Sequence, residues 1–193
     1  MKMVEMMLFE RPGNQNTADC VKLVAKHVKE HGRKHVVVAS TSGKTAMAFH
    51  KALQNNGTNL VVVTHSVGFK EPGHDEFDPD LRRQLKKARV PIHTGTILTH
   101  SLEKSIMDSF RGIYPGYLIA NTLRRFGEGT KVAMEIVMEA CDAGLIPENE
   151  EVLGIGGTYR GSDTVLLIKS KPSKRFLELD VLEILARPRG RGD

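Results

Sequence analysis

The sequence has no tryptophan and only 5% aromatic residues, so it lacks the aromatic side chains on which single-stranded nucleic acids stack. Its two cysteines, Cys20 and Cys141, are far apart and each lies in a helical pattern, which favours buried reduced thiols over a disulfide or a metal site. No apolar run approaches the roughly eighteen residues that a membrane span needs. Residues 1–10 fit a first strand and lack the pattern of a signal peptide. We therefore expect a soluble, cytoplasmic protein with no membrane partner.

Basic residues outnumber acidic ones, and the net charge is +5. Clustered Lys and Arg would indicate a nucleic-acid partner, because phosphate backbones attract them. Here they are divided between two predicted helices and a Pro/Gly-rich tail over residues 187–193, which we expect to be flexible. This distribution is typical of solvated surfaces and argues against nucleic acid as a partner.

At 193 residues, the chain is long enough for one domain with a substantial core. The β-branched run 35–39 predicts a strand covered on both faces, the pattern at 46–53 a helix, and the run 60–64 a second buried strand. Further helices are predicted from the N-cap Asn16 to Gly32, from Asp78 to about Ala88, and over 102–110, 117–126 and 131–143. Further strands are predicted over 90–93, 150–156 and 164–169, with a last one from the alternation at 177–181.

Strands that alternate with helices predict a three-layer α/β/α fold with a mostly parallel central sheet. Ligands of such sheets bind beyond the carboxyl ends of the strands. The loops that follow Ala39, Val63, His93 and Gly156 are therefore the first places to look for a site.

A turn rich in hydroxyl groups joins the strand ending at Ala39 to the next helix, with the sequence Ser-Thr-Ser-Gly-Lys-Thr over residues 40–45. Its hydroxyls, its glycine and the free amides of a helix N-terminus predict a cradle for a phosphate, to which Lys44 adds positive charge. Capping the helix would need only one of these hydroxyls. A nucleoside triphosphatase loop is excluded because Val38 stands where that motif needs a glycine.

A second glycine-rich turn spans residues 156–163. Gly154, Gly156 and Gly157 resemble a dinucleotide fingerprint, but Tyr159 occupies the last glycine position and a strand follows, which excludes that motif. Two interpretations stay open. The turn is either an ordinary hairpin turn or a flexible loop that brings Arg160 and Ser162 to the same ligand as the first turn.

Histidines at the same predicted edge could move protons near neutral pH, namely His65, His74, His93 and His100, although most loop histidines are simply solvated. Acidic residues near His74 match no calcium or zinc spacing, so we expect a solvated acidic loop and no metal. Glu135, Glu139 and Asp142 share one helix face, for which the solvent surface is the default interpretation. If that face lines a pocket instead, Glu135 could accept hydrogen bonds from a ligand.

Taken together, the two turns and the strand ending in Val63-Thr64 resemble the C-terminal α/β domain of pyruvate kinase over residues 17–65 and 131–169. Residues 66–130 would then be an insertion. The whole chain resembles more closely the small stand-alone members of this family, including the loop 12–17 and the helix end 140–144. The catalytic barrel of pyruvate kinase does not fit in this length, so the resemblance implies no kinase activity.

In pyruvate kinase, the first turn grips a phosphate of a sugar-phosphate effector and the second turn closes over it; the stand-alone proteins are associated with flavin mononucleotide (FMN). The resemblance therefore implies an FMN-binding protein and, by extension, a flavin-dependent oxidoreductase. The alternative is a non-catalytic domain that binds a sugar phosphate or nucleotide as an effector and acts through a partner or a homo-oligomer. The residues expected to hold the ligand are Ser40, Thr41, Ser42, Gly43, Lys44, Thr45, Thr64, His65, Glu135, Gly156, Gly157, Arg160, Gly161 and Ser162.

Overall fold

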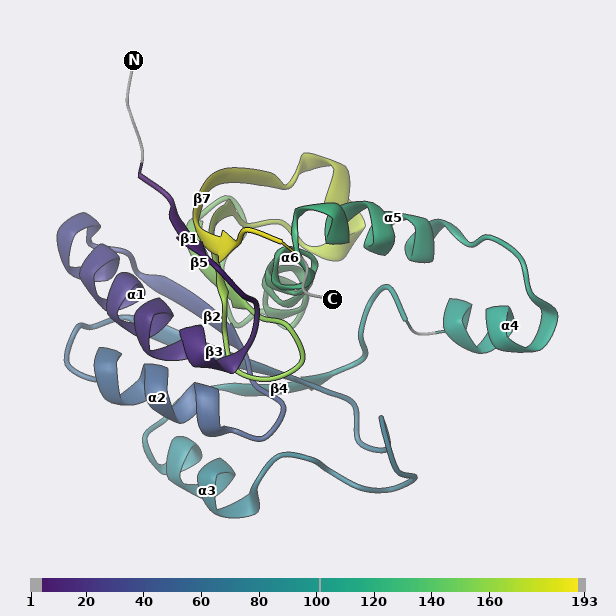
Figure 1. The fold of residues 1–193 in the computed structure, drawn as a ribbon. Helices are drawn as coiled ribbons and strands as arrows, with labels where there is room; N and C mark the ends of the chain where they lie inside the picture. The colour runs from purple at the N-terminus through teal and green to yellow at the C-terminus, as the bar shows by residue number, and fades with distance from the viewer. Residues whose placement is uncertain (1–4, 101, 191–193) are drawn as a thin grey trace.

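The computed structural model describes residues 5–100 and 102–190, whose strands form one sheet in the order β1-β7-β6-β5-β2-β3-β4 (Figure 1). Strand β6 runs antiparallel to β5 and β7, and every other neighbouring pair is parallel. The strands are β1 (Met7–Phe9), β2 (His35–Ala39), β3 (Asn59–His65), β4 (Ile92–Gly95), β5 (Glu151–Gly156), β6 (Thr164–Lys169) and β7 (Asp180–Pro188). The predicted mostly parallel sheet is confirmed.

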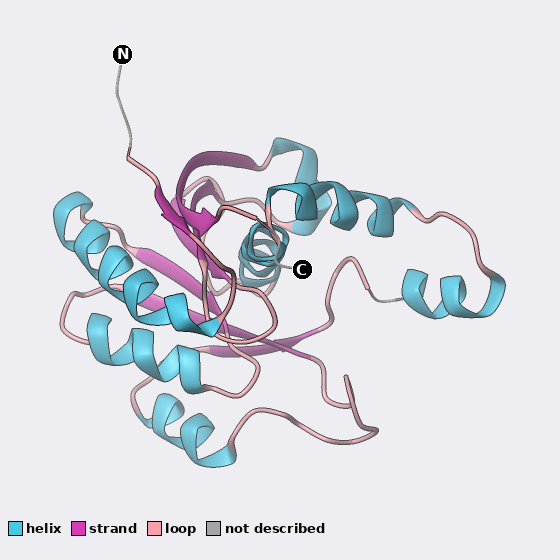
Figure 2. Ribbon diagram, viewed as in Figure 1, coloured by secondary structure: helices cyan, strands magenta, loops and turns pink. Residues whose placement is uncertain are grey.

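Helices lie on both faces of this sheet (Figure 2). One face carries α1, α2 and α3, and the other carries α6. The α-helices are α1 (Thr17–His31), α2 (Lys44–Leu53), α3 (Pro79–Lys87), α4 (Leu102–Phe110), α5 (Pro115–Leu123) and α6 (Glu128–Asp142), and the 3-10 helices are η1 (Asn14–Asn16), η2 (Arg124–Phe126) and η3 (Ser173–Glu178). None of the helices in the described ranges is long and apolar enough to cross a membrane.

The central strand β2 shows why the sheet is buried on both sides. Val36 and Val38 pack into the core beneath α1, α2 and α3, whereas Val37 packs into the core beneath α6. All three side chains are fully buried, as the alternation of side chains along a strand requires when both faces are covered. The continuous β-branched run in the sequence is explained by this position.

Two strands differ from the sequence-based prediction. After α3 the chain makes a tight turn in which the Val90 N–H donates to the Leu85 carbonyl, so β4 begins at Ile92 and not at residue 90. Near the C-terminus, Leu177 lies in η3, and β7 begins only at Asp180. Short local alternation does not distinguish a strand from a 3-10 turn that packs against α6.

The chain termini also differ from expectation. Arg187 and Pro188, expected in a flexible tail, belong to β7 and pair with β1, while residues 191–193 of that tail lie outside the described residues. Asn16 does not cap α1 with its side chain; its Nδ2 donates instead to the Arg11 carbonyl, 2.7 Å away. Gly32 ends α1 in the left-handed conformation, as predicted.

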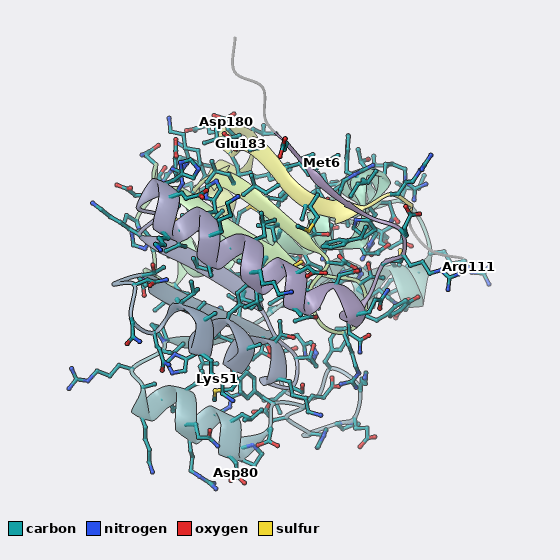
Figure 3. All side chains as sticks on the ribbon, turned by 60° about the vertical axis from the view of Figure 1, so that its left-hand side comes forward. Met6, Lys51, Asp80, Arg111, Asp180 and Glu183 are labelled. Carbon is teal, nitrogen blue, oxygen red and sulfur yellow. The ribbon has the colours of Figure 1, made fainter. Side chains whose placement is uncertain are left out.

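The expected insertion over residues 66–130 contains two different parts. Its first part, with α3 and β4, is built into the main body, where Phe77 and Leu85 are buried in the core. Its second part includes α4, none of whose described side chains is buried and which stands away from the sheet (Figure 1). Arg111, which follows α4, is exposed and projects outward (Figure 3).

Candidate functional site

A cavity of about 600 Å³ lies at the carboxyl ends of β2 and β3. Its walls come from the turn after β2, the ends of β3 and the following segment, the loop between β5 and β6, and one face of α6. Segments far apart in the chain therefore meet at the sheet edge where the sequence places the site.

The turn after β2 brings three hydroxyl side chains to the cavity, those of Thr41, Ser42 and Thr45. Ser40 also lines it, but its Oγ accepts a hydrogen bond from the Ala46 N–H at 3.2 Å. Ser40 thereby satisfies one of the amides at the start of α2, which has no side-chain cap at its N-cap residue. One of the turn's hydroxyls therefore serves the helix, and no hydrogen bond within the described residues uses the side chains of Thr41, Ser42 and Thr45.

Gly43 and Lys44 belong to the same turn, but the structure does not place them among the residues that line the cavity. Gly43 has φ 86°, and a Cβ there would lie 2.6 Å from the Phe77 ring, so its conformation and its close contact with the segment before α3 both require glycine. Lys44 is exposed.

Thr64 and His65, at the end of β3, both line the cavity as expected. His65 Nε2 lies 3.2 Å from Glu76 Oε2, and Lys70 Nζ lies 3.0 Å from Glu76 Oε1. The hydrogen bond from Lys70 is the main reason that the pKa of Glu76 is lowered, so a carboxylate is held ionised beside His65.

Of the other candidate histidines, only His100 lines the cavity. Burial, followed by the positive charges of Lys131 and Arg124, lowers the pKa of His100, which favours a neutral imidazole. His93 lies with its Nε2 3.9 Å from Glu139 Oε2, and His74 is exposed.

The loop between β5 and β6 is the hairpin connection of two antiparallel strands, and it also forms a wall of the cavity. It brings Arg160 to the cavity but not Ser162, and its role in holding a ligand stays a prediction. Gly157, Arg160 and Gly161 line the cavity. A Cβ on Gly157 would lie 2.5 Å from the Gly161 carbonyl oxygen, and Gly161 has φ 74°, so both glycines are needed for the path of the loop.

Ser162 and Gly156, both expected at the ligand, are not among the residues that line the cavity. Ser162 is 1% exposed, and its buried Oγ has no hydrogen-bond partner among the described residues. It lies beside Cys20 of α1, whose pKa is raised to about 12 mainly by burial. Gly156 faces α6, where a Cβ would lie 2.3 Å from the Gly129 carbonyl oxygen. These two residues shape the loop and the sheet–helix contact.

One face of α6 carries three charged residues, Lys131, Glu135 and Glu139, which are at most 5% exposed and line the cavity. The default expectation that this face meets solvent is wrong for both glutamates. Glu135 Oε1 accepts hydrogen bonds from the N–H and Oγ1 of Thr99, each at 3.0 Å, and its Oε2 pairs with Lys131 Nζ. Asp142 lies outside the cavity, where its Oδ1 accepts from the Ser173 N–H.

Burial changes the acidity of this face. It raises the pKa of Glu139 to about 8, with the nearby charge of Glu135 as the next cause. It also lowers the pKa of Lys131, although Glu135 acts in the opposite direction. A carboxyl that holds its proton at neutral pH therefore stands beside an ion pair.

Sequence reasoning missed Lys131, Arg124 and Thr99. For Lys131 there was a signal, since it precedes Glu135 by four residues on a largely apolar helix, the spacing of an ion pair. Arg124 lines the cavity from η2, and Thr99 lies in an irregular segment after β4. No periodic pattern marks either of them.

The cavity combines hydroxyl and charged groups with a comparable apolar surface that includes Val63, Val132 and Ile136. Hydroxyls, helix-terminal amides and Arg160 suit a phosphate, and the apolar side chains suit a ring. Among the residues that the structure describes, no group of three or more His, Cys, Asp or Glu is placed to hold a metal ion.

The sequence matches a known protein family. The family described as "Pyruvate kinase, alpha/beta domain" matches residues 18–168. Among solved structures, the NH3-dependent NAD synthetase from Campylobacter jejuni, in complex with the nitrate ion, is 15% identical, with a TM-score of 0.34. That similarity covers 57% of this chain and 47% of the synthetase, so the chain spans less than half of the matched structure.

Proposed function

Since the chain belongs to the pyruvate kinase alpha/beta domain family, we propose that its cavity binds a phosphate-bearing small molecule and that this ligand is FMN. The observation that carries the proposal is the turn at residues 40–45, whose hydroxyl-bearing residues line the cavity at the N-terminus of α2. In this proposal the turn binds the phosphate and Arg160 approaches it from the β5–β6 loop.

The phosphate end rests on two electrostatic features. A helix N-terminus carries partial positive charge and amides without carbonyl partners, and both favour a bound anion. Because Ser40 takes up the Ala46 N–H, the hydroxyls of Thr41, Ser42 and Thr45 are left to hydrogen-bond phosphate oxygens. Arg160 then supplies a full positive charge in a geometry suited to a phosphate.

The ring end supports FMN over a bare sugar phosphate. The cavity volume of about 600 Å³ lies within the usual range for cofactor sites, roughly 300–1,000 Å³. Val63, Val132 and Ile136 give it apolar surface beyond the phosphate turn. When bound, FMN would supply hydride and electron transfer, while the protein positions the ring and limits water around it. Flavin-dependent oxidoreduction is the reaction class that we propose.

Flavin fluorescence tests the proposal directly. FMN titrated into the wild-type protein should bind, and the Thr41→Val/Ser42→Ala double variant should bind roughly 10- to 100-fold more weakly because two phosphate hydrogen bonds are lost. The Ser105→Ala/Ser109→Ala variant is a matched control, since it removes two exposed hydroxyls from α4. It should bind FMN like the wild type.

Three outcomes separate the alternatives. Weakening by the turn variant but not by the α4 variant supports the proposal. If FMN fails to bind, but a sugar phosphate or nucleotide raises the melting temperature, the non-catalytic effector-binding alternative replaces it. If inorganic phosphate, FMN, nucleotides and sugar phosphates all leave the protein unchanged, the phosphate site itself is refuted.

A further inference from the structure

Glu139 occupies an unusual position on the α6 wall of the cavity. Glu139 is 5% exposed and lines the cavity on the side of β4. A Cβ on Gly95 would lie 2.4 Å from Glu139 Oε2, so the absence of a side chain at the end of β4 makes room for this carboxyl. The structure therefore accommodates the carboxyl at the cavity and does not turn it outward.

The two buried glutamates of α6 differ in their hydrogen bonds. Both oxygens of Glu135 are used by Thr99 and Lys131. Within residues 5–100 and 102–190, no group hydrogen-bonds the carboxyl of Glu139, and His93 Nε2 lies 3.9 Å from its Oε2. Buried polar groups normally have a hydrogen-bond partner, and Glu139 has one only if something in the cavity provides it.

The charges around Glu139 determine which form of the carboxyl a ligand would meet. Glu135, Lys131 and Asp142 act on it from its own helix, and His93 faces it from β4. Burial and Glu135 together outweigh Lys131, so the pKa of Glu139 is raised to about 8. A neutral carboxyl has one O–H donor and one carbonyl acceptor side by side.

We propose that Glu139 is the specificity residue of the cavity and recognises a C(=O)–NH edge on the ligand's ring. Its O–H donates to the ring carbonyl, and its carbonyl oxygen accepts from the ring N–H. The inference rests on the proposed function, because it assumes that the phosphate end is held by the turn at residues 40–45. Flavins share this edge with uracil and guanine bases, so the proposal specifies the hydrogen-bonding edge, which a flavin or a nucleobase can supply.

Two substitutions at this position make opposite predictions. Glu139→Leu removes donor and acceptor and should weaken FMN binding roughly 10- to 100-fold at pH 7. Glu139→Gln keeps one donor and one acceptor in the same shape, so it should bind within a few-fold of the wild type. Asp108→Asn, a carboxylate-to-amide change at an exposed position on α4 outside the cavity, is the matched control and should leave binding unchanged.

The pH dependence separates hydrogen-bond recognition from mere packing. Above the Glu139 pKa of about 8 the carboxylate cannot donate, so wild-type affinity for FMN should fall about tenfold between pH 8 and pH 9.5. Glu139→Gln should lose none of its affinity over this range, because an amide does not titrate there. Inorganic phosphate, used as a competitor at each pH, reports any change at the phosphate turn.

Nucleotides identify the source of the edge. Uridine and guanosine monophosphates carry the C(=O)–NH edge, and adenosine monophosphate does not. If FMN binds and none of the nucleotides does, the ligand is a flavin. If uridine or guanosine monophosphate binds in preference to adenosine monophosphate, the ligand carries a nucleobase. Either outcome supports the role of Glu139 if Glu139→Leu weakens the binding of that ligand.

Two results would overturn the inference. If FMN binds the wild type and Glu139→Leu equally, with no pH difference between wild type and Glu139→Gln, Glu139 has no such role while the proposed function stands. If the wild type binds neither FMN nor any other phosphate compound, the proposed function and this inference fail together.

Discussion

Residues that line the cavity differ in whether their side chains are already hydrogen-bonded within the chain. The side chains of Ser40 and Glu135 have hydrogen bonds within the chain, whereas Ser42 and Glu139 line the cavity and their side chains have no such bonds in the described residues. This division was invisible in the sequence, where the hydroxyls at residues 40–45 and the acids on α6 form uniform sets. Only the packing of distant segments distinguishes their members.

Glu139 makes a prediction for stability in the absence of any ligand. Its pKa is about 8 in the folded chain against an ordinary 4.5, so between these values the folded state binds more protons than the unfolded state. The free energy of unfolding therefore includes a contribution that is full below about pH 4.5 and is lost as the pH rises to 8. In urea unfolding at pH 5, 6, 7 and 8, Glu139→Gln should gain stability relative to the wild type as the pH increases.

Asp108→Asn provides the comparison for this titration, because it changes an exposed carboxylate on α4 to an amide away from the cavity. The difference between it and the wild type should stay constant over the same pH range. Parallel stability curves for Glu139→Gln and the wild type would show that Glu139 titrates normally.

The site was predictable where its residues are consecutive in the chain and unpredictable where they are not. The hydroxyl turn follows directly from a buried strand and a helix start, so its place at the sheet edge could be inferred. The burial of Lys131 and Glu139 depends on β4 and the segment around Thr99, which pack over α6. Helical periodicity alone assigns such charged residues to the solvent.

At the scale of elements, the close packing of α6 against β5 fixes the position of the cavity wall that α6 forms. At Gly154 and Gly156 of β5, an added Cβ would lie 3.0 Å from the Ala133 carbonyl oxygen and 2.3 Å from the Gly129 carbonyl oxygen of α6, so side chains have no room between the two backbones. Backbone approach of this kind fixes α6 close to the sheet, and with it Lys131 and Glu139. The glycines that resembled a nucleotide fingerprint thus have a packing role.

Gly156→Ala tests this contact. The added Cβ would lie 2.3 Å from the Gly129 carbonyl oxygen, which is rigid backbone, so α6 must shift. We expect a loss of about 1–3 kcal/mol in the free energy of unfolding, measured by urea denaturation, and weaker FMN binding because the α6 residues move with the helix. Gly190→Ala is the control, since nothing lies within 4 Å of its Cβ. Equal stability of both variants would contradict the close contact.

The elements differ in how much of them the sequence determines. The strands β2, β5 and β6 were predicted almost to the residue, because their apolar runs are buried on both faces and have clear ends: the hydroxyl turn after β2, Gly156 in β5 and the polar segment before Pro172 after β6. The edge strand β4 and the start of β7 were misplaced by two or three residues. Their limits depend on the turn after α3 and on the packing of η3 against α6, neither of which leaves a periodic pattern.

Across the whole molecule, the β5–β6 loop connects the cavity to the opposite face of the sheet. Residues 157–161 of this loop line the cavity. Immediately afterwards, the Ser162 N–H donates to Thr17 Oγ1 and Asp163 accepts from the Gly13 N–H. The same loop therefore holds the start of α1, and a ligand that fixes the cavity side also stabilises the packing of α1.

The labelling rate of Cys20 tests this connection between the cavity and α1. It is fully buried in α1 beside Ser162, and burial raises its pKa to about 12, so a maleimide should label it only when the chain opens. A ligand that binds only the folded state reduces that opening, and FMN at 100 times its dissociation constant should slow Cys20 labelling about 100-fold. Mass spectrometry of pulse-labelled protein measures this rate. The half-buried Cys141 is the internal reference, because it can be labelled without opening of the chain and its labelling rate should change little when FMN binds. Cys20 labelling that is unaffected by saturating FMN would show that α1 opens independently of the cavity.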